Sequence, residues 1–420
     1  MLRNKKIIGS VLAAAALALM PLVSTHAQIG PHADVTYNGV GYTRSINGGT
    51  SGSASGCNGT VIGVYGSSAL KGYIQQAAKD FCANTSANPS GYDVEYAGGG
   101  DSCPGDLYAQ QDSTDPIVGV SDVFSDSCAN DAQPPVDSTQ INDTLLAVNI
   151  VDEIATCPSA QQPNGGAVNP AGATQCGPFS TDPGASGSSS CSPAAISLAQ
   201  AQLLYNQQIG NERAIGGCSH ANAVQNRVAG SGTRITFCFN VFGAGIDLCK
   251  NEGSAQPLAP TTGTEVNDVC GPTAADGNYA QGYVTRSAIV GDPRSTASPK
   301  TALQGCGVVT VGGFSGYNGT CNPTNPGATG GQQSPVAPTG VIDCPGDNDV
   351  AAGRYQIWGY EHLVTNASGN AAAASFVSFL TTTPSEDTAL TRAQGFMQQC
   401  QMGFKRTADA GPYSPQSASC

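Results

Sequence analysis

The sequence predicts an α/β protein of two lobes, each built as a mixed sheet flanked by helices. The first observation is length: 420 residues exceed the roughly 100–200 residues of a usual domain. The second is a unit that recurs in the first third of the chain, in which a short apolar strand passes through small residues into a helix. Repeated units of this kind are typical of a sheet whose ligand-binding loops gather at one edge.

The first residues have the pattern of an export signal. Basic residues at Arg3, Lys5 and Lys6 precede an apolar run that ends in small residues before Ala27. We expect residues 1–27 to be a signal peptide cleaved after Ala27, because the apolar run is short for a bilayer span. No later stretch is long and apolar enough to cross a membrane. We therefore expect a periplasmic or secreted protein that does not span the membrane.

Cysteine usage indicates an oxidising compartment. All sixteen cysteines lie from Cys57 onward, and their even number allows up to eight disulfides. Their pairing cannot be deduced from sequence. No Cys-x-x-Cys pair occurs, and only His32, His220 and His362 remain after cleavage, so we expect neither a metal site nor a cofactor.

The charge balance argues against a nucleic-acid partner. The formal net charge is −13, and loss of the basic leader makes it more negative, whereas nucleic-acid binding needs a basic patch. With charged residues at only 11%, the surface is expected to be largely neutral and polar. We expect a monomer.

The expected elements of the first half follow from apolar spacing. Residues 61–65 form a strand, and residues 70–81 have the apolar spacing of a helix. Two more strands, residues 92–96 and 116–121, end in small or N-capping residues. Residues 144–150 have the character of a buried strand.

The second half contains fewer clear elements. We expect a helix over residues 197–208 with Ser197 as its N-cap, a strand at 355–358 and a helix at 371–380. Two stretches near residues 157–193 and 318–344 are rich in glycine, serine and proline and contain cysteines, which predicts disulfide-rich loop insertions.

The division into lobes follows from the order of these elements. We expect residues 28–148 and 351–420 to form lobe 1 and residues 149–350 to form lobe 2. The chain would then cross between the lobes near Asn149 and again near 351–355, where a hinge would allow closure on a ligand.

The segment from Arg227 to Thr233, with the sequence Arg-Val-Ala-Gly-Ser-Gly-Thr, has the chemistry of an anion clamp. A helix that begins at Ser231 to Thr233 offers free backbone N–H groups, a favourable dipole and two hydroxyls. Gly232 lets the backbone approach a ligand, and Arg227 adds a permanently charged fork. The alternative is an ordinary capped helix beside a surface arginine.

Three further loops offer similar chemistry where a predicted strand ends. Each can direct amides or hydroxyls at a shared ligand, and each is equally explained as a structural turn, because Gly, Ser and Asp favour turns. The candidate residues in these loops are Ser67, Ser68 and Ala69, then Asp101 and Ser102, and then Asp122.

These elements together resemble the phosphate-binding proteins of bacterial ABC importers, which have a periplasmic-binding-protein fold of the second type. The resemblance extends in order from Val61 to Met397, apart from the cysteine-rich stretches. Its seven elements lie at residues 66–69, 96–100, 118–122, 146–150, 198–205, 227–233 and 355–361. The arginine followed by Gly-Ser-Gly-Thr is the most specific of them.

The resemblance implies a role for each candidate residue. Ser231, Gly232, Thr233 and Arg227 would bind phosphate oxygens, and Ser68 with the Ala69 amide would bind another oxygen from the opposite lobe. Asp122 would accept a hydrogen bond from a protonated phosphate, which sulfate does not offer at neutral pH.

The chain departs from the family pattern at two positions. The family usually has a serine where this chain has Asp101, so that Ser102 is an alternative donor, and an acidic residue where it has Ala229. The ligand is therefore expected to be phosphate or a related oxyanion.

The sequence thus leads to two hypotheses of function. The first is a non-catalytic solute-binding protein for ABC-type uptake or scavenging, with an ABC permease as the implied partner. The second is a secreted structural or adhesion protein on the same fold that has lost or changed its ligand. An enzyme is not expected, because no Gly-x-Ser-x-Gly elbow occurs and few histidines are present.

Overall fold

The computed structural model describes eleven stretches of the chain, together with Glu386. They are residues 35–37, 40–42, 57–131, 136–156, 195–209, 224–243, 258–270, 281–290, 306–314, 347–383 and 395–416, apart from Asn58, Gly313 and Ala410. The predicted signal peptide and both predicted cysteine-rich insertions lie outside these residues.

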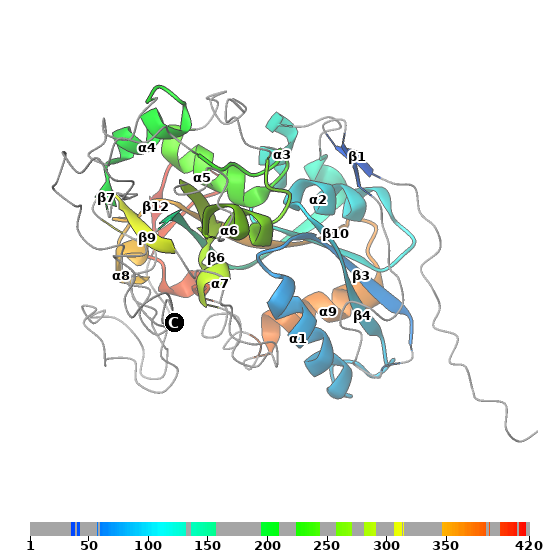
Figure 1. The fold of residues 1–420 in the computed structure, drawn as a ribbon. Coiled ribbons are helices and arrows are strands. Elements are labelled where there is room, and N and C mark those ends of the chain that lie inside the picture. The colour runs from blue at the N-terminus through cyan, green and yellow to red at the C-terminus, as the bar shows by residue number, and fades with distance from the viewer. Residues whose placement is uncertain are drawn as a thin grey trace, which may run out of the picture.

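A mixed sheet forms the centre of the molecule (Figure 1). Its strands are hydrogen-bonded in the order β4-β3-β5-β10-β6-β9-β7, and β8 also pairs with β6. The strands β3, β4 and β5 are parallel to one another, and β10 is antiparallel to β5 and β6. The strand bounds are β3 Val61–Ser67, β4 Asp93–Gly100, β5 Ile117–Ser121, β6 Ile141–Thr156, β7 Ala195–Ile196, β8 Gln281–Thr285, β9 Cys306–Val311 and β10 Trp358–Asn366.

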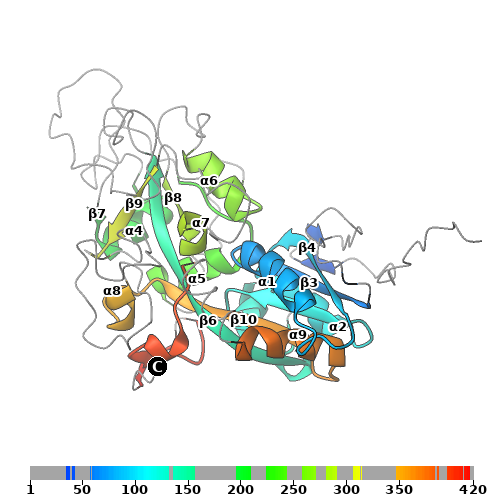
Figure 2. The ribbon, with the colours of Figure 1, turned by 90° about the horizontal axis from the view of Figure 1, so that it is seen from below.

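Two long strands connect the lobes. The part of β6 up to Ile150 pairs with β10, and the part from Val151 onward pairs with β8 and β9. In Figure 2, β6 and β10 run through the middle of the molecule, with β3, β4 and α1 on one side and β8, β9 and α4 on the other. The predicted fold class is confirmed: two lobes, each a mixed sheet flanked by helices. The exact lobe boundaries stay a prediction.

Helices cover the sheet because their apolar faces need burial. In lobe 1, α1 and α9 pack on one face around Phe81, Phe376 and Phe379, whose rings meet at centroid distances of 5.2–5.3 Å. The helix bounds are α1 Lys71–Ala83, α2 Ser102–Gln111, α3 Ser125–Asp131, α4 Leu198–Tyr205, α5 Gly232–Phe242, α6 Thr262–Cys270, α7 Arg286–Val290, α8 Asp347–Ala351 and α9 Ala371–Thr382. The small elements are β1 Val35–Tyr37, β2 Val40–Tyr42, β11 Phe404–Lys405, β12 Ser414–Pro415 and the 3-10 turns Ser138–Gln140 and Gln399–Gln401.

A second core lies around β6, α4 and α5. It contains the fully buried Trp358 and a stack of Phe237 on Tyr283 at 4.3 Å between ring centroids. As predicted, Ser197 caps α4: its hydroxyl accepts a hydrogen bond from the Gln200 N–H, and the Gln200 side-chain oxygen accepts one from the Ser197 N–H.

Most of the predicted elements are confirmed, with two corrections. The predicted strand at residues 355–358 is wrong: β10 begins at Trp358, and Tyr355 instead buries its ring and donates a hydrogen bond to the Val151 carbonyl. The predicted strand at 144–150 is too short, because β6 continues to Thr156 through the buried Asp152 and Glu153. A polar pair usually marks the end of an apolar strand, but here it lies inside the lobe core.

Two disulfides lie wholly among the described residues. Cys57–Cys82 joins the segment before β3 to the end of α1, and Cys103–Cys128 joins α2 to α3. Cys400 is also disulfide-bonded. These bonds agree with the oxidising compartment that the cysteine count predicts.

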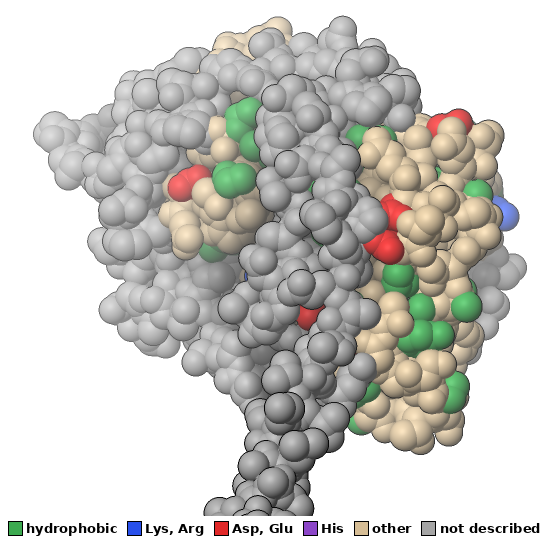
Figure 3. Space-filling view, turned by 90° about the vertical axis from the view of Figure 1, so that its right-hand side faces the viewer, with side chains coloured by type: hydrophobic (Ala, Val, Ile, Leu, Met, Phe, Trp, Pro, Cys, Tyr) green, Lys and Arg blue, Asp and Glu red, His purple; other side chains and the backbone are tan. Residues whose placement is uncertain are grey.

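The surface of the described residues is poor in charge. On the face shown in Figure 3, neutral side chains dominate and basic groups are sparse, as expected for a chain with 11% charged residues. Among the described residues, no helix combines the length and apolar character needed to cross a membrane.

The two disulfides permit a matched stability test, because both have a sequence separation of 25. Loop-closure entropy predicts a loss of roughly 3–4 kcal/mol in the free energy of unfolding when either pair is replaced by alanine. Denaturant unfolding of the Cys57→Ala, Cys82→Ala and Cys103→Ala, Cys128→Ala variants measures both losses. A larger loss of unfolding free energy in the Cys103→Ala, Cys128→Ala variant than in the other would show that this disulfide also supports the contacts between α2 and α3.

Candidate functional site

The carboxyl ends of β3, β4 and β5 form one edge of lobe 1. Because these strands are parallel, the loops that follow them meet at this edge. Helix α2 lies directly against β3: a Cβ atom on Gly105 would be 2.7 Å from the Gly66 Cα atom. This close approach, which only glycine permits, brings Ser102 at the start of α2 to the edge.

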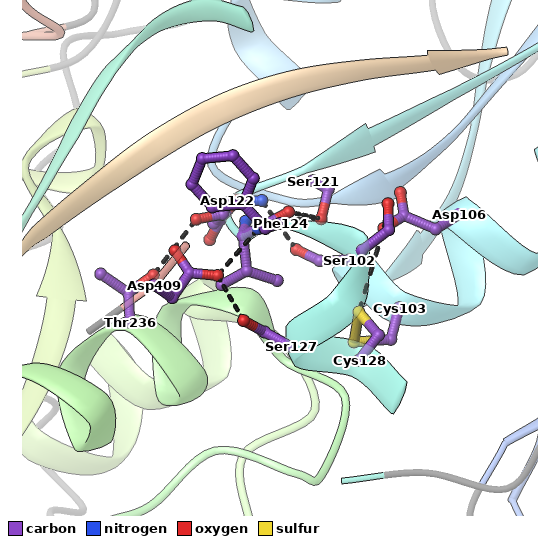
Figure 4. Close-up of a disulfide and its surroundings, with 12 residues drawn as sticks. Ser102, Cys103, Asp106, Ser121, Asp122, Phe124, Ser127, Cys128, Thr236 and Asp409 are labelled. Carbon is purple, nitrogen blue, oxygen red and sulfur yellow. Dashed lines mark hydrogen bonds between the residues drawn. A yellow bond between two sulfur atoms is a disulfide. The ribbon is translucent and has the colours of Figure 1, made fainter. Parts of the chain in front are cut away.

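Asp122 is the centre of this edge. Its side chain is 1% exposed, and its backbone N–H donates to Ser102 Oγ at 3.0 Å (Figure 4). Its carboxyl group is hydrogen-bonded by Ser67 and Thr233. Burial raises the pKa of Asp122, while these hydrogen bonds and the Arg227 charge lower it.

Helix α5 places its N-terminus against this edge. Ser231 is the N-cap as predicted, and its Oγ atom accepts a hydrogen bond from the Arg234 N–H at 3.5 Å. The Thr233 hydroxyl donates to Asp122 Oδ2 at 2.8 Å. Gly232 fits between them because it has no side chain: a Cβ atom there would lie 2.3 Å from Ser102 Oγ and 2.8 Å from Asp122 Cβ.

Arg227, which precedes α5 in the chain, lies at the same junction. It is 1% exposed, and its guanidinium group donates to the Ala259 carbonyl at 3.1 Å and to Thr262 Oγ1 at 3.0 Å. Its own carbonyl accepts a hydrogen bond from Arg234 Nη1 at 3.1 Å. A buried, fixed guanidinium group is a strong site for a planar or tetrahedral oxyanion.

Thr262 links this arginine to the opposite loop. Its Oγ1 atom lies 3.0 Å from Arg227 Nη1 and 3.0 Å from Ser68 Oγ. Thr262 also begins helix α6, and its N–H donates to Ser68 Oγ at 3.4 Å. A single hydroxyl therefore connects the loop after β3 to the start of α6.

Glu265, one turn further along α6, is a buried acid near the arginine. Its Oε1 atom accepts the Tyr283 N–H at 3.2 Å. Burial raises the pKa of Glu265 to about 8, although the Arg227 charge and the Tyr283 hydrogen bond lower it. Glu265 thus supplies an acidic group near Arg227, where the family pattern has its acid at the position of Ala229.

A second buried acid, Glu361 on β10, contacts Asp122. It is 0% exposed, and its carboxyl group lies close enough to that of Asp122 for the two to interact. Burial, and then the interaction with Asp122, raise the pKa of Glu361 well above its usual range. Burial and the charges of Asp122, Asp101 and Glu361 also raise the pKa of Tyr96, whose hydroxyl lies 2.9 Å from the Ser67 carbonyl oxygen.

The C-terminal segment returns to the loop that follows Asp122. Asp409 Oδ2 accepts hydrogen bonds from the Phe124 N–H at 2.8 Å and from Ser127 Oγ at 2.7 Å. Figure 4 shows Asp409 beside these two residues and the Cys103–Cys128 disulfide close by. Arg406 of the same segment lies 3.6 Å from the Trp358 ring centroid and donates to Asn240 of α5 at 3.0 Å. The segment therefore holds α5 and the Asp122 loop together.

Most of the ten candidate residues lie at this junction. Ser102 and Asp122 meet the α5 residues Gly232 and Thr233 directly, and Ser67 interacts with the Asp122 carboxyl group. Ser68 meets Arg227 through Thr262. The Ala69 N–H donates to Ser67 Oγ at 3.1 Å, and Asp101 is the residue before α2, with no side-chain hydrogen bond to cap it.

Three residues of this junction were missed by the sequence analysis. Thr262 begins a short helix that follows a loop without a clear apolar pattern, although Thr261-Thr262-Gly263 is a possible helix start. Glu265 lies in the same segment, where no strong apolar pattern exists that a buried acid would interrupt. Glu361 was recognised only as part of the 355–361 element, yet a glutamate inside an apolar strand is itself a signal of a buried polar partner.

The part of the chain that the structure describes contains no group of three or more His, Cys, Asp or Glu side chains placed to hold a metal ion. What the junction offers is a guanidinium group, hydroxyls and a helix N-terminus beside a carboxylate. Groups of these kinds have the chemistry to bind and orient an oxyanion that carries a hydroxyl.

Comparison with known proteins gives the fold. No family model matches the chain, and no curated protein is significantly similar to it in sequence. A structure described as a phosphate ABC transporter substrate-binding protein with bound phosphate, from Clostridium perfringens, is 14% identical over 81% of this chain and 99% of its own, with a TM-score of 0.50.

Two further structures are similar at lower scores. An ABC-type phosphate transport receptor from Vibrio cholerae is 14% identical, covering 81% of this chain and 100% of its own with a TM-score of 0.46. A phosphate-binding protein from Stenotrophomonas maltophilia is 15% identical, covering 81% and 90% with a TM-score of 0.44. The chain thus has the fold of periplasmic substrate-binding proteins.

Replacing Gly232 by alanine tests the contact between α5 and the lobe 1 edge. Alanine suits the start of a helix, so the clash with Ser102 and Asp122 is expected to dominate and to destabilise the fold by about 1–3 kcal/mol. Thermal unfolding measures the change. Gly263→Ala on α6 is the matched control, because its Cβ atom would meet only Thr261 Oγ1 at 3.7 Å, and an equal loss there would contradict the interpretation.

The raised pKa of Glu265 predicts a pH-dependent stability. The folded state holds this proton up to about pH 8, whereas the unfolded chain releases it near pH 4.3, so its contribution is lost as pH rises between these values. Glu265→Gln keeps the acceptor for Tyr283 but cannot ionise. Relative to this variant, the ligand-free wild type should lose on the order of 2–4 kcal/mol between pH 5 and pH 8; parallel unfolding profiles would show that Glu265 is already ionised in the folded protein.

Proposed function

We propose that this protein is an exported solute-binding protein that captures phosphate or a related oxyanion between its two lobes. The observation that carries the proposal is the junction of three groups: the N-terminus of α5, the buried Arg227 side chain and the loops of lobe 1 around Asp122. Each lobe contributes donors, so closure on a ligand completes its coordination.

The proposed coordination assigns distinct tasks. Arg227 and the N–H groups at the start of α5 balance the negative charge of the ligand. Ser68 and the Ala69 N–H bind an oxygen from the lobe 1 side, and Asp122 accepts the hydroxyl proton of a hydrogen phosphate. We further propose that an ABC permease receives the ligand, by analogy with the proteins that share this fold.

One observation favours the alternative function. The Arg227 guanidinium group already donates hydrogen bonds to the Ala259 carbonyl and to the Thr262 hydroxyl. The Thr262 hydroxyl is also hydrogen-bonded to that of Ser68. A chain that kept the fold as a secreted structural or adhesion protein, without a ligand, would be expected to close its former site with its own side chains in this way.

Titration calorimetry with phosphate, arsenate and sulfate distinguishes the two functions. The solute-binding proposal expects saturable binding of phosphate and arsenate and weaker binding of sulfate. Absence of binding for all three ions at millimolar concentration would favour the structural alternative.

The Arg227→Ala variant tests the site itself. Loss of a buried guanidinium ligand is expected to weaken phosphate binding by about 2–5 kcal/mol. Arg354→Ala is the control for net charge, because Arg354 is about half exposed and pairs with Asp349 at 2.7 Å away from the site. Equal affinities of the two variants would remove Arg227 from the proposed coordination.

A further inference from the structure

Glu361 occupies an unusual position for an acid. It lies on β10, in the interior of the sheet, and is completely buried. The pairing of β10 with β6 shifts register between Glu361 and His362, and such a bulge re-aims a side chain. On the same strand, a Cβ atom at Gly359 would lie 3.0 Å from the Asp122 carbonyl oxygen, so β10 passes directly beside the Asp122 loop.

The two carboxyl groups must share a proton. No N–H or O–H group of the described residues donates to either Glu361 oxygen or to Asp122 Oδ1, and the two carboxyl groups lie close enough to act on each other. Two ionised carboxylates in contact in a buried site repel each other, so one of them keeps a proton. Asp122 receives hydrogen bonds from Ser67 and Thr233 and lies near the Arg227 charge, which all favour its ionised form.

We propose that Glu361 is a specificity-determining partner of Asp122, which donates a shared proton to Asp122 and thereby keeps Asp122 an acceptor for the hydroxyl group of a protonated oxyanion. Without this donor, the pKa of Asp122 would rise, and Asp122 would distinguish less well between an oxyanion that carries a hydroxyl and one that does not. The inference rests on the proposed function, and it adds a residue that does not touch the ligand but acts through Asp122.

The charged and titratable groups that surround the pair are few. Arg227 and Glu361 act on Asp122, and Tyr96 lies near both acids together with Asp101. The Arg227 charge favours the first ionisation of the pair, that of Asp122. The second ionisation adds a further negative charge beside the anion site, next to that of Asp122.

Two substitutions separate hydrogen bonding from ionisation. Glu361→Gln keeps a donor to Asp122 but cannot lose a proton, so its phosphate-to-sulfate affinity ratio at pH 7 should stay within about threefold of the wild type. As pH rises through the raised pKa of Glu361, the wild type should lose more phosphate affinity than this variant, because only the wild type gains a second charge. Comparing the two proteins at each pH cancels the ionisation of phosphate itself.

Glu361→Leu removes the donor at similar volume. The phosphate-to-sulfate ratio should fall by about tenfold or more, through weaker phosphate binding. Glu153→Gln replaces another buried acid, one on β6 beyond Ile150 whose charge acts on Tyr355, and should leave the ratio unchanged. A folded leucine variant with the wild-type ratio overturns the proposal; should that variant fail to fold, a glutamine variant with the wild-type pH profile overturns it equally.

Infrared spectroscopy of the ligand-free protein tests the shared proton without any ligand. At neutral pH the wild type should show a protonated-carboxyl C=O band that Glu361→Gln loses, and a spectrum unchanged by the substitution overturns the inference. Failure of the wild type to bind phosphate and sulfate, with this band present and lost in the variant, would reject the proposed function while leaving the proton-sharing pair established.

Discussion

Burial of the Asp122 carboxylate is the constraint around which the junction of the lobes is organised. An ionised carboxylate removed from water is costly unless hydrogen bonds and an opposite charge compensate it. Asp122 is compensated from several directions: Ser67 ends β3, Thr233 opens α5 and Glu361 lies on β10. Its backbone is held as well, by Ser102 and by the Thr236 hydroxyl, which donates to its carbonyl at 3.2 Å. Residues of β3, α5 and β10 thus converge on a single acidic group.

The same junction concentrates more acid than base. Asp122, Glu265 and Glu361 are all buried there, and the Arg227 charge acts on Asp122 and Glu265. Burial raises the pKa of both glutamates, that of Glu265 to about 8, so each favours its neutral form more than an exposed glutamate does. A chain with a formal net charge of −13 can thereby present a site where local positive potential survives, since neutral carboxyl groups donate hydrogen bonds without repelling an anion.

Elements with strong local signals could be predicted, and contacts between distant elements could not. The strand at 61–65, the helix after it and the cap of α5 at Ser231 follow from apolar spacing and capping chemistry alone. The error at Tyr355 arose because its aromatic ring continues an apolar alternation, while its hydroxyl bonds to Val151 across 204 residues. Thr262 and Glu361 acquire their roles from partners far away in sequence, so spacing carries no trace of them.

The hydrogen bonds of Asp409 have a consequence for how the protein is made. Asp409 lies 285 residues beyond Phe124 and 282 beyond Ser127, so the loop that carries Asp122 receives its last support from the end of the chain. Contacts of such high sequence separation form late, because a long loop must close first. The edge of lobe 1 that carries Asp122 therefore reaches its final shape only after synthesis has passed Asp409, and a chain cut just before this residue would leave the edge unfinished.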